Sequence, residues 1–157
     1  MENTEKLLKL LEKNAMLTSE QLGSMLSMPA AEVEAMKRKL LDDGVIKGSS
    51  IFYDDGGATV KAIIEISVTP TAGNGFDEIA KSIKTFPQVE SLYLSSGNSD
   101  LAAIVKASSF REVSDFVAAS LSPLDGVIGT KTNFLMTRYK ENGFEIERSD
   151  GDERVDL

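Results

Sequence analysis

The hydrophobic repeat of this chain changes near residue 60, and this change constrains the fold more than any other feature of the sequence. Before that point apolar residues recur at helical spacing, as in Leu7, Leu10 and Leu11. From Val60 the sequence VKAIIEISV alternates with a period of two, which is typical of a strand with one buried face. We therefore predict a helical N-terminal domain followed by a domain that mixes strands and helices.

Three short helices are predicted in the N-terminal domain. The first covers residues 4–14, and the second begins at Thr18, which forms a capping box with Gln21. The sequence SMPA breaks the pattern before a third helix. Three helices with a tight turn between the last two are typical of a helix-turn-helix, so residues 1–50 are predicted as a DNA-binding domain. Residues 51–59, which contain an Asp-Gly-Gly turn, are predicted as a wing and hinge.

Residues 60–140 are predicted to form a ferredoxin-like βαββαβ domain. The expected order is strand, helix, strand, strand, helix, strand, at 60–68, 76–86, 88–95, 100–107, 109–121 and 127–139. Helices cover only one face of such a sheet, so the other face, which includes Ile63, stays partly apolar and uncovered. A surface of this kind is typical of an interface, and we expect the chain to pair with a second copy of itself.

Composition excludes several classes of function. The 157 residues include no cysteine, histidine or tryptophan, which removes thiol nucleophiles, histidine bases and nearly all zinc chemistry. We expect no enzyme activity, no metal site and no cofactor. No apolar run approaches the roughly 20 residues of a membrane helix, and the N-terminus does not resemble a signal peptide, so a cytoplasmic location without a membrane partner is expected.

The net charge of −8 argues against non-specific affinity for nucleic acid, which depends on lysine and arginine at phosphates. Much of the excess negative charge lies near the C-terminus. Residues 141–157 are predicted as an acidic tail, most simply a solvated extension. The alternative is that this tail screens the basic residues and tunes affinity for DNA.

The order of these elements resembles the Lrp/AsnC family, the leucine-responsive or feast/famine regulators. The matching motifs are LLDDGVIKG, FPQVESLYLSSGNSDLAAIV and PLDGVIGTKTNFLMTRYK. The resemblance implies an α+β fold, with an N-terminal winged helix-turn-helix followed by a ferredoxin-like domain called a RAM domain. It also implies a transcriptional regulator that binds double-stranded DNA and an amino acid, as a homodimer or as a tetramer or octamer built from dimers.

By this resemblance, the effector binds around the loop between the second and third strands of the RAM domain and near two polar positions of its last strand. The residues concerned are Ser95, Ser96, Gly97, Asn98, Ser99, Asp100, Leu101, Thr130 and Thr132. Backbone N–H groups of the loop suit the carboxylate of an amino acid, and Asp100 suits its ammonium group. The alternative is a plain hairpin turn in which Asp100 bonds its own backbone.

The DNA contacts are expected at the start of the second helix and on the outward side of the third. They are Thr18, Ser19, Ala30, Ala31, Glu32, Glu34, Ala35, Lys37 and Arg38. Two interpretations of Glu34 stay open, because glutamate can accept a hydrogen bond from cytosine or form an i, i+4 pair with Arg38. The acidic helix also leaves open a second function, an amino-acid-sensing or protein-partner module whose helix-turn-helix binds little DNA.

Overall fold

The computed structural model describes residues 2–69 and 75–146, which divide into two compact units between Tyr53 and Asp54. The boundary falls inside the predicted wing and hinge. Most of the predicted acidic tail, residues 147–157, lies outside the described residues. No helix in the described part of the chain has the length and apolarity needed to cross a membrane.

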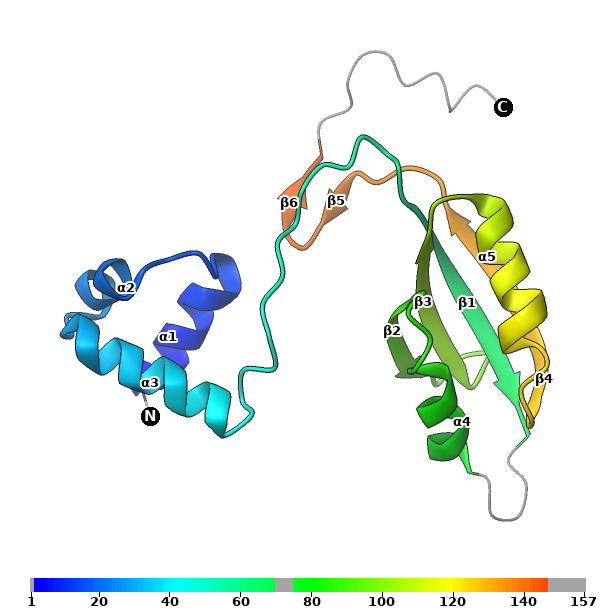
Figure 1. Cartoon of the computed structure of the whole chain (residues 1–157), viewed down its shortest axis with the longest axis horizontal. Coiled ribbons are helices and arrows are strands. Elements are labelled where there is room, and N and C mark those ends of the chain that lie inside the picture. Colours follow the sequence, from blue (N-terminus) through cyan, green and yellow to red (C-terminus); the bar gives the residue numbers. More distant parts are fainter. Residues whose placement is uncertain (1, 70–74, 147–157) are drawn as a thin grey trace. The chain divides into compact units, whose positions relative to one another are not determined.

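The N-terminal unit contains the three helices α1 (Glu2–Lys13), α2 (Ser19–Leu26) and α3 (Ala30–Asp42), which Figure 1 labels. Their buried core consists of Leu7, Leu22, Val33 and Leu40, so every helix contributes an apolar side chain to it. The predicted capping box is confirmed, because the Thr18 hydroxyl accepts a hydrogen bond from the Gln21 N–H and the Gln21 side chain accepts one from the Thr18 N–H.

The predicted wing strands do not form, since residues 43–59 contain no strand. The expected Asp-Gly-Gly turn is present, with Gly56 and Gly57 at φ values of 62° and 75°. Asp54 and Asp55 each accept a hydrogen bond from a backbone N–H two residues later. Local bonds of this kind satisfy N–H groups that a strand would need for its ladder, which favours an irregular segment over a hairpin.

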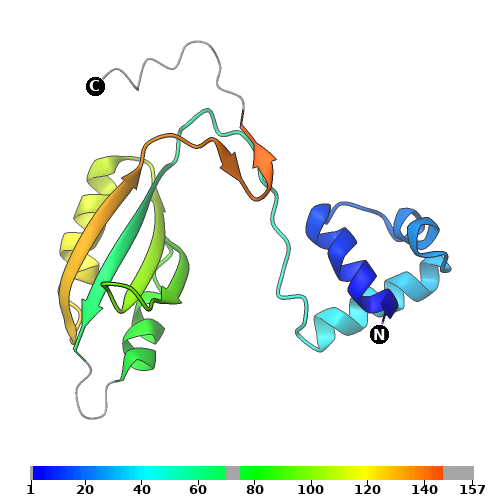
Figure 2. The same cartoon turned by 180° about the vertical axis from the view of Figure 1, so that it is seen from behind.

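The C-terminal unit is a four-stranded antiparallel sheet in the order β2-β3-β1-β4, with α4 and α5 on the same face (Figures 1 and 2). This order confirms the ferredoxin-like prediction. The strands are β1 (Val60–Val68), β2 (Val89–Leu94), β3 (Leu101–Ala107) and β4 (Val127–Leu135). The helices are α4 (Phe76–Ile83) and α5 (Phe110–Phe116), and α5 continues into a π-helical turn, η1 (Val117–Leu121).

The core lies between this sheet and its helices. It comprises alternate residues of β1 and β3 together with apolar residues of α4, α5 and η1, namely Ala62, Ile64, Ile66, Val68, Leu101, Ala103, Val105, Ile79, Ile83, Val113, Phe116 and Leu121. Ile63 and Ile104 pair across β1 and β3 on the opposite face, where both are half-buried. That uncovered face is mixed in character, because Glu65 at its centre accepts a hydrogen bond from Asn133 at 2.8 Å.

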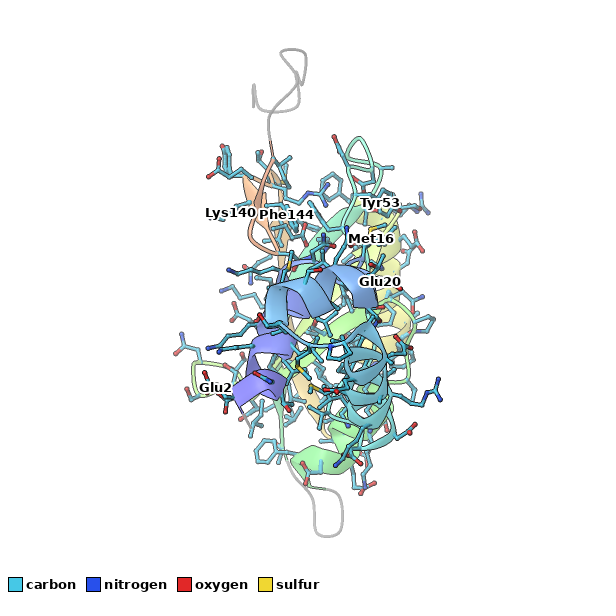
Figure 3. All side chains as sticks on the ribbon, turned by 90° about the vertical axis from the view of Figure 1, so that its left-hand side faces the viewer. Glu2, Met16, Glu20, Tyr53, Lys140 and Phe144 are labelled. Carbon is cyan, nitrogen blue, oxygen red and sulfur yellow. The ribbon has the colours of Figure 1, made fainter. Side chains whose placement is uncertain are left out.

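A short hairpin follows the sheet, where the sequence predicted only a solvated acidic tail. Its strands are β5 (Lys140–Glu141) and β6 (Phe144–Glu145), and Figure 3 labels Lys140 and Phe144, one on each strand. Asn142 and Gly143 connect them with φ values of 50° and 86°. Two consecutive positive φ values are what a type I′ turn requires, and Asn-Gly is the preferred sequence for it. The prediction of a tail was therefore wrong for residues 141–146.

Candidate nucleic-acid interface and effector loop

The turn between α2 and α3 is tight because it contains Gly23. This residue is buried in α2, and a Cβ atom placed there would lie 2.6 Å from the backbone oxygen of Met28. Ser27 ends α2 in the left-handed region, with φ of 54°. The close approach fixes how α3 leaves the turn, and it therefore determines which side of α3 faces outward.

The outward side of α3 includes small residues, Arg38 and the exposed Glu34. Ala31, Ala35 and Arg38 are exposed and follow one another at i, i+4 and i+7, opposite the buried Val33 and Leu40. Ala30 and Lys37 are half-buried at the margin of this surface, and Glu32 is exposed. We call Ala31, Ala35 and Arg38 the α3 face. Small side chains let a helix backbone approach another surface closely, and Arg38 adds one donor group with a positive charge.

Glu34 is exposed, but its carboxylate contacts two side chains of its own domain. Its carboxylate accepts a hydrogen bond from the Ser19 hydroxyl at 2.6 Å, and Lys37 Nζ lies 3.8 Å away. The Ser19 hydrogen bond is the main reason that the pKa of Glu34 is below its usual value, and Lys37 lowers the pKa further. Of the two open interpretations, the i, i+4 ion pair of Glu34 with Arg38 does not form, because Glu34 contacts Ser19 and Lys37 instead. Thr18 and Ser19 serve the structure of α2 through its cap and this bond.

The loop from Ser95 to Asp100 is anchored to β1. The Ser95 N–H donates to the Asp100 carbonyl at 2.8 Å, and the Asp100 N–H donates to the Ile66 carbonyl at 3.1 Å. The Asp100 carboxylate accepts a hydrogen bond from the Val68 N–H at 2.8 Å through Oδ2. Asp100 thus bonds to a neighbouring strand, which neither predicted interpretation of its side chain included.

The tip of the loop keeps several donors available. Ser96, Gly97 and Asn98 are exposed, and Gly97 N–H donates to the Ser95 hydroxyl at 3.3 Å. Within the described residues, the N–H groups of Asn98 and Ser99 make no hydrogen bond. Neither Gly97 nor Asn98 has a positive φ, so the loop turns without the left-handed backbone that its composition suggested.

The structure does not bring all predicted effector residues together in one chain. Thr130 and Thr132 pair with Ile66 and Ile64, which places them on the helix-covered side of β4. Thr130 lies near Ser122, with 3.4 Å between the two hydroxyl oxygens. Because β1 separates β3 from β4, these threonines are about 10 Å from the β3 end of the loop.

An open groove of about 500 Å³ adjoins the loop, and the sequence did not predict it. It lies between α4 and β2, where Leu94 directly precedes the loop and Leu101 directly follows it. Its walls include Phe76, Tyr93 and the Lys81 side chain. Leu101 is the one predicted effector residue that lines it. The register of a helix against an edge strand creates this groove, and no local sequence pattern encodes it.

Comparison with known proteins identifies the family. Residues 61–143 match the model of the Lrp/AsnC ligand binding domain. YugG, an HTH-type transcriptional regulator of Bacillus subtilis, is 38% identical to this chain. The match covers 99% of this chain and 98% of YugG. The chain belongs to the Lrp/AsnC family. It is a transcriptional regulator with a helix-turn-helix domain and a ligand-binding domain, and it is not an enzyme.

More distant Lrp/AsnC relatives agree. The HTH-type regulator LysM of Saccharolobus solfataricus is 27% identical over 88% of this chain and 94% of its own length. The structure of Mycobacterium tuberculosis LrpA has a TM-score of 0.77 at 18% identity, covering 94% and 99% of the two chains. A Neisseria meningitidis regulator solved as an L-Met complex has a TM-score of 0.75 at 20% identity, covering 90% and 92%. These structures support the fold of both units.

Proposed function

We propose that this Lrp/AsnC regulator acts in the cytoplasm as a homodimer or a ring of dimers, binds operator DNA through α3, and senses an amino acid with its C-terminal domain. The observation that carries the DNA-binding part is the α3 face. Arg38 makes no ion pair among the described residues, while the neighbouring Glu34 is occupied by Ser19 and Lys37. Arg38 is exposed, and its positive side chain is therefore available to meet phosphate or base edges.

The proposed amino-acid site is the loop from Ser95 to Asp100. The free N–H groups of Asn98 and Ser99 suit a carboxylate, and the second oxygen of Asp100, Oδ1, suits an ammonium group. The L-Met complex of the Neisseria meningitidis relative supports an amino acid as ligand class. Thr130 and Thr132 lie two strands away from this loop. We therefore assign the site to the loop and propose that the threonines of a second subunit complete it, as the resemblance to the family implies.

A gel-shift experiment with the DNA upstream of the gene, with and without each common amino acid, tests the whole proposal. We expect a shifted band whose affinity changes with one or a few amino acids. A parallel thermal-shift screen should raise the melting temperature with the same amino acids, because a ligand that binds only the folded state stabilises it. Ligand stabilisation without any DNA shift would instead support a sensing module with a degenerate helix-turn-helix.

Replacing Arg38 tests the α3 face. Arg38→Gln should weaken operator binding about tenfold at low salt and reduce the slope of log affinity against log salt by about one, because one phosphate contact is lost. Fluorescence anisotropy across salt concentrations measures both quantities. Arg111→Gln removes the same charge from an exposed pair with Asp115 in the other unit and should change neither. An unchanged affinity and slope for Arg38→Gln would contradict the assignment.

Asp100 is tested with two variants, because its carboxylate also supports β1. Asp100→Asn keeps an oxygen for the Val68 N–H but removes the charge, so the melting temperature should stay near that of the original chain. Binding of the amino acid should fall by about tenfold to a hundredfold, since a charge-assisted hydrogen bond contributes about 1.5–3 kcal/mol. Calorimetry measures the affinity. Equal affinity in Asp100→Asn and the unmodified chain would remove Asp100 from the ammonium site.

The second variant, Asp100→Ala, separates the structural role. It removes the acceptor as well as the charge, which leaves the Val68 N–H without its partner. We expect a lower melting temperature for Asp100→Ala than for Asp100→Asn. Equal melting temperatures of the two variants would show that the bond to Val68 adds nothing to stability.

A further inference from the structure

A chain of alternating charges ties the segment before β1 to the C-terminal hairpin. Arg138 donates to Asp55 at 2.9 Å through one nitrogen and to Glu141 at 3.1 Å through another. The other oxygen of Glu141 pairs with Lys61, and Lys61 also contacts Glu90 at 2.9 Å. The chain therefore links the hinge, the hairpin, β1 and β2 in a single network.

These ion pairs are better shielded than the surface pairs elsewhere in the molecule. The side chains of Asp55 and Arg138 are 12% and 28% exposed, whereas the Arg111 and Asp115 side chains are 90% and 72% exposed. Partly buried pairs are screened less by salt and hold their geometry better than exposed pairs. The Asp55 network is thus positioned to act as a structural tie.

Asp55 also organises the backbone that it anchors. Its two carboxylate oxygens accept hydrogen bonds from the N–H groups of Gly57 at 3.0 Å and Thr59 at 3.1 Å. The hydrogen bond from Thr59 has the largest effect on the pKa of the Asp55 carboxyl. Together with the Gly57 N–H and Arg138, it lowers this pKa to about 2. The carboxylate is therefore charged throughout the neutral range. Residues 55–59 form a compact turn that Arg138 fastens to the rest of the C-terminal unit.

We propose that the Asp55–Arg138 pair is a clamp that sets the length of the tether between the DNA-binding domain and the C-terminal domain. Ile46 is the last residue packed on the N-terminal core. With the clamp closed, the connection from Ile46 ends at Asp55; with it open, the connection extends to Val60, where β1 begins. The added residues 55–59 lengthen the tether by up to about 17 Å, at about 3.3–3.6 Å for each extended residue.

The consequence rests on the proposed binding of DNA by paired subunits. Two recognition helices on one duplex must reach half-sites at a fixed separation, and a short tether penalises wrong separations more than a long one. With the clamp closed, the protein thus discriminates between operators by the separation of their half-sites. Neither recognition helix could make that distinction by itself. Substitutions that open the clamp will therefore change how well the protein tolerates altered spacing between the half-sites. They will leave base recognition by α3 intact.

A distance measurement tests the clamp without DNA. The chain has no cysteine, so cysteines introduced at the exposed Glu12 and Ala119 are unique positions for spin labels. Labelled chains are diluted with unlabelled chains, and double electron–electron resonance gives the distance distribution. Arg138→Gln should broaden the distribution and extend its long limit by up to about 17 Å. Arg111→Gln, which removes the same charge from the same unit, should leave it unchanged.

Asp55→Asn should broaden the distribution in the same direction, and the double variant should add little, because both substitutions open one clamp. Circular dichroism verifies that each variant stays folded. Identical distributions for Arg138→Gln and the original chain would overturn the clamp. Broadening by Arg111→Gln of equal size would overturn it too, because the effect would then follow net charge.

The second measurement uses DNA with two half-sites separated by zero, two, four or six inserted base pairs. The original chain should lose affinity steeply with each insertion, and Arg138→Gln should lose at least threefold less across the series. Equal steepness in both proteins would refute the effect on spacing. If the original chain binds no operator at all, the proposed DNA-binding function fails, while the distance measurement still decides whether the clamp exists.

Discussion

Gly126→Ala is expected to destabilise the C-terminal domain by about 2–5 kcal/mol. Gly126 has φ of 86°, a conformation that costs an L-residue about 1–2 kcal/mol. A Cβ atom there would also lie 2.7 Å from Cδ1 of Ile79 and 3.4 Å from the carbonyl oxygen of Thr69. Overpacking of this kind costs about 1–3 kcal/mol more. Chemical denaturation of the C-terminal domain, followed by circular dichroism, measures the change.

Two further substitutions divide this effect into its parts. Gly143 has the same φ of 86°, and among the described residues no atom lies within 4 Å of an added Cβ, so Gly143→Ala reports backbone strain alone. Combining Gly126→Ala with Ile79→Val removes the clashing Cδ1 atom and should restore part of the lost stability. Equal losses for Gly126→Ala and Gly143→Ala would contradict a role for the contact with α4.

Gly23→Ala is expected to disrupt the helix-turn-helix and abolish operator binding. The added Cβ would lie 2.6 Å from the Met28 backbone oxygen, which cannot move without shifting the turn between α2 and α3. The domain has a small core, so a loss of about 1–3 kcal/mol removes a large part of its stability. Anisotropy with operator DNA measures the loss of binding, and hydrogen exchange localises the loss of structure to residues 2–46.

The matched control is Gly48→Ala, because no atom in the described part of the chain lies within 4 Å of a Cβ at that position. It should bind DNA like the original chain. In Gly23→Ala the stabilisation of the C-terminal domain by its amino acid should persist, since the two units have separate cores. Normal operator affinity in Gly23→Ala would mean that the turn tolerates the methyl group and that the tight approach of α2 to α3 is dispensable.

Periodicity predicted the main elements well because it depends on neighbours in sequence. The alternation in β1 placed Ala62, Ile64 and Ile66 in the core, as the structure confirms. Helical spacing also predicts that Phe76 and Phe110 lie on the inner faces of their helices, whereas they are 37% and 47% exposed. Both residues lie at the first position of their helices, although the Phe110 ring still packs edge-to-face against Phe134 of β4, with 5.0 Å between the ring centroids. At the end of a helix, the burial predicted from periodicity therefore need not agree with the burial in the structure.

Local turn chemistry was partly missed. The hairpin around Asn142 and Gly143 carries the Asn-Gly signal of a type I′ turn, which could have been found in the sequence. Its acidic surroundings favoured a solvated tail instead. The pairing of Glu141 with Lys61 and Arg138 offsets that charge, and residues far apart in sequence supply it.

The sequence by itself determined the succession of helices and strands, the capping box at Thr18 and the family, because each depends on residue type at short spacing. Tertiary structure decided what the functional side chains contact. In the folded chain, Asp100 accepts a hydrogen bond from the Val68 N–H and Glu34 accepts one from the Ser19 hydroxyl. Asp55 forms an ion pair with Arg138. These partners are 32, 15 and 83 residues apart in sequence. Only the packing of one element against another brings them within hydrogen-bonding distance, and no local repeat specifies that packing.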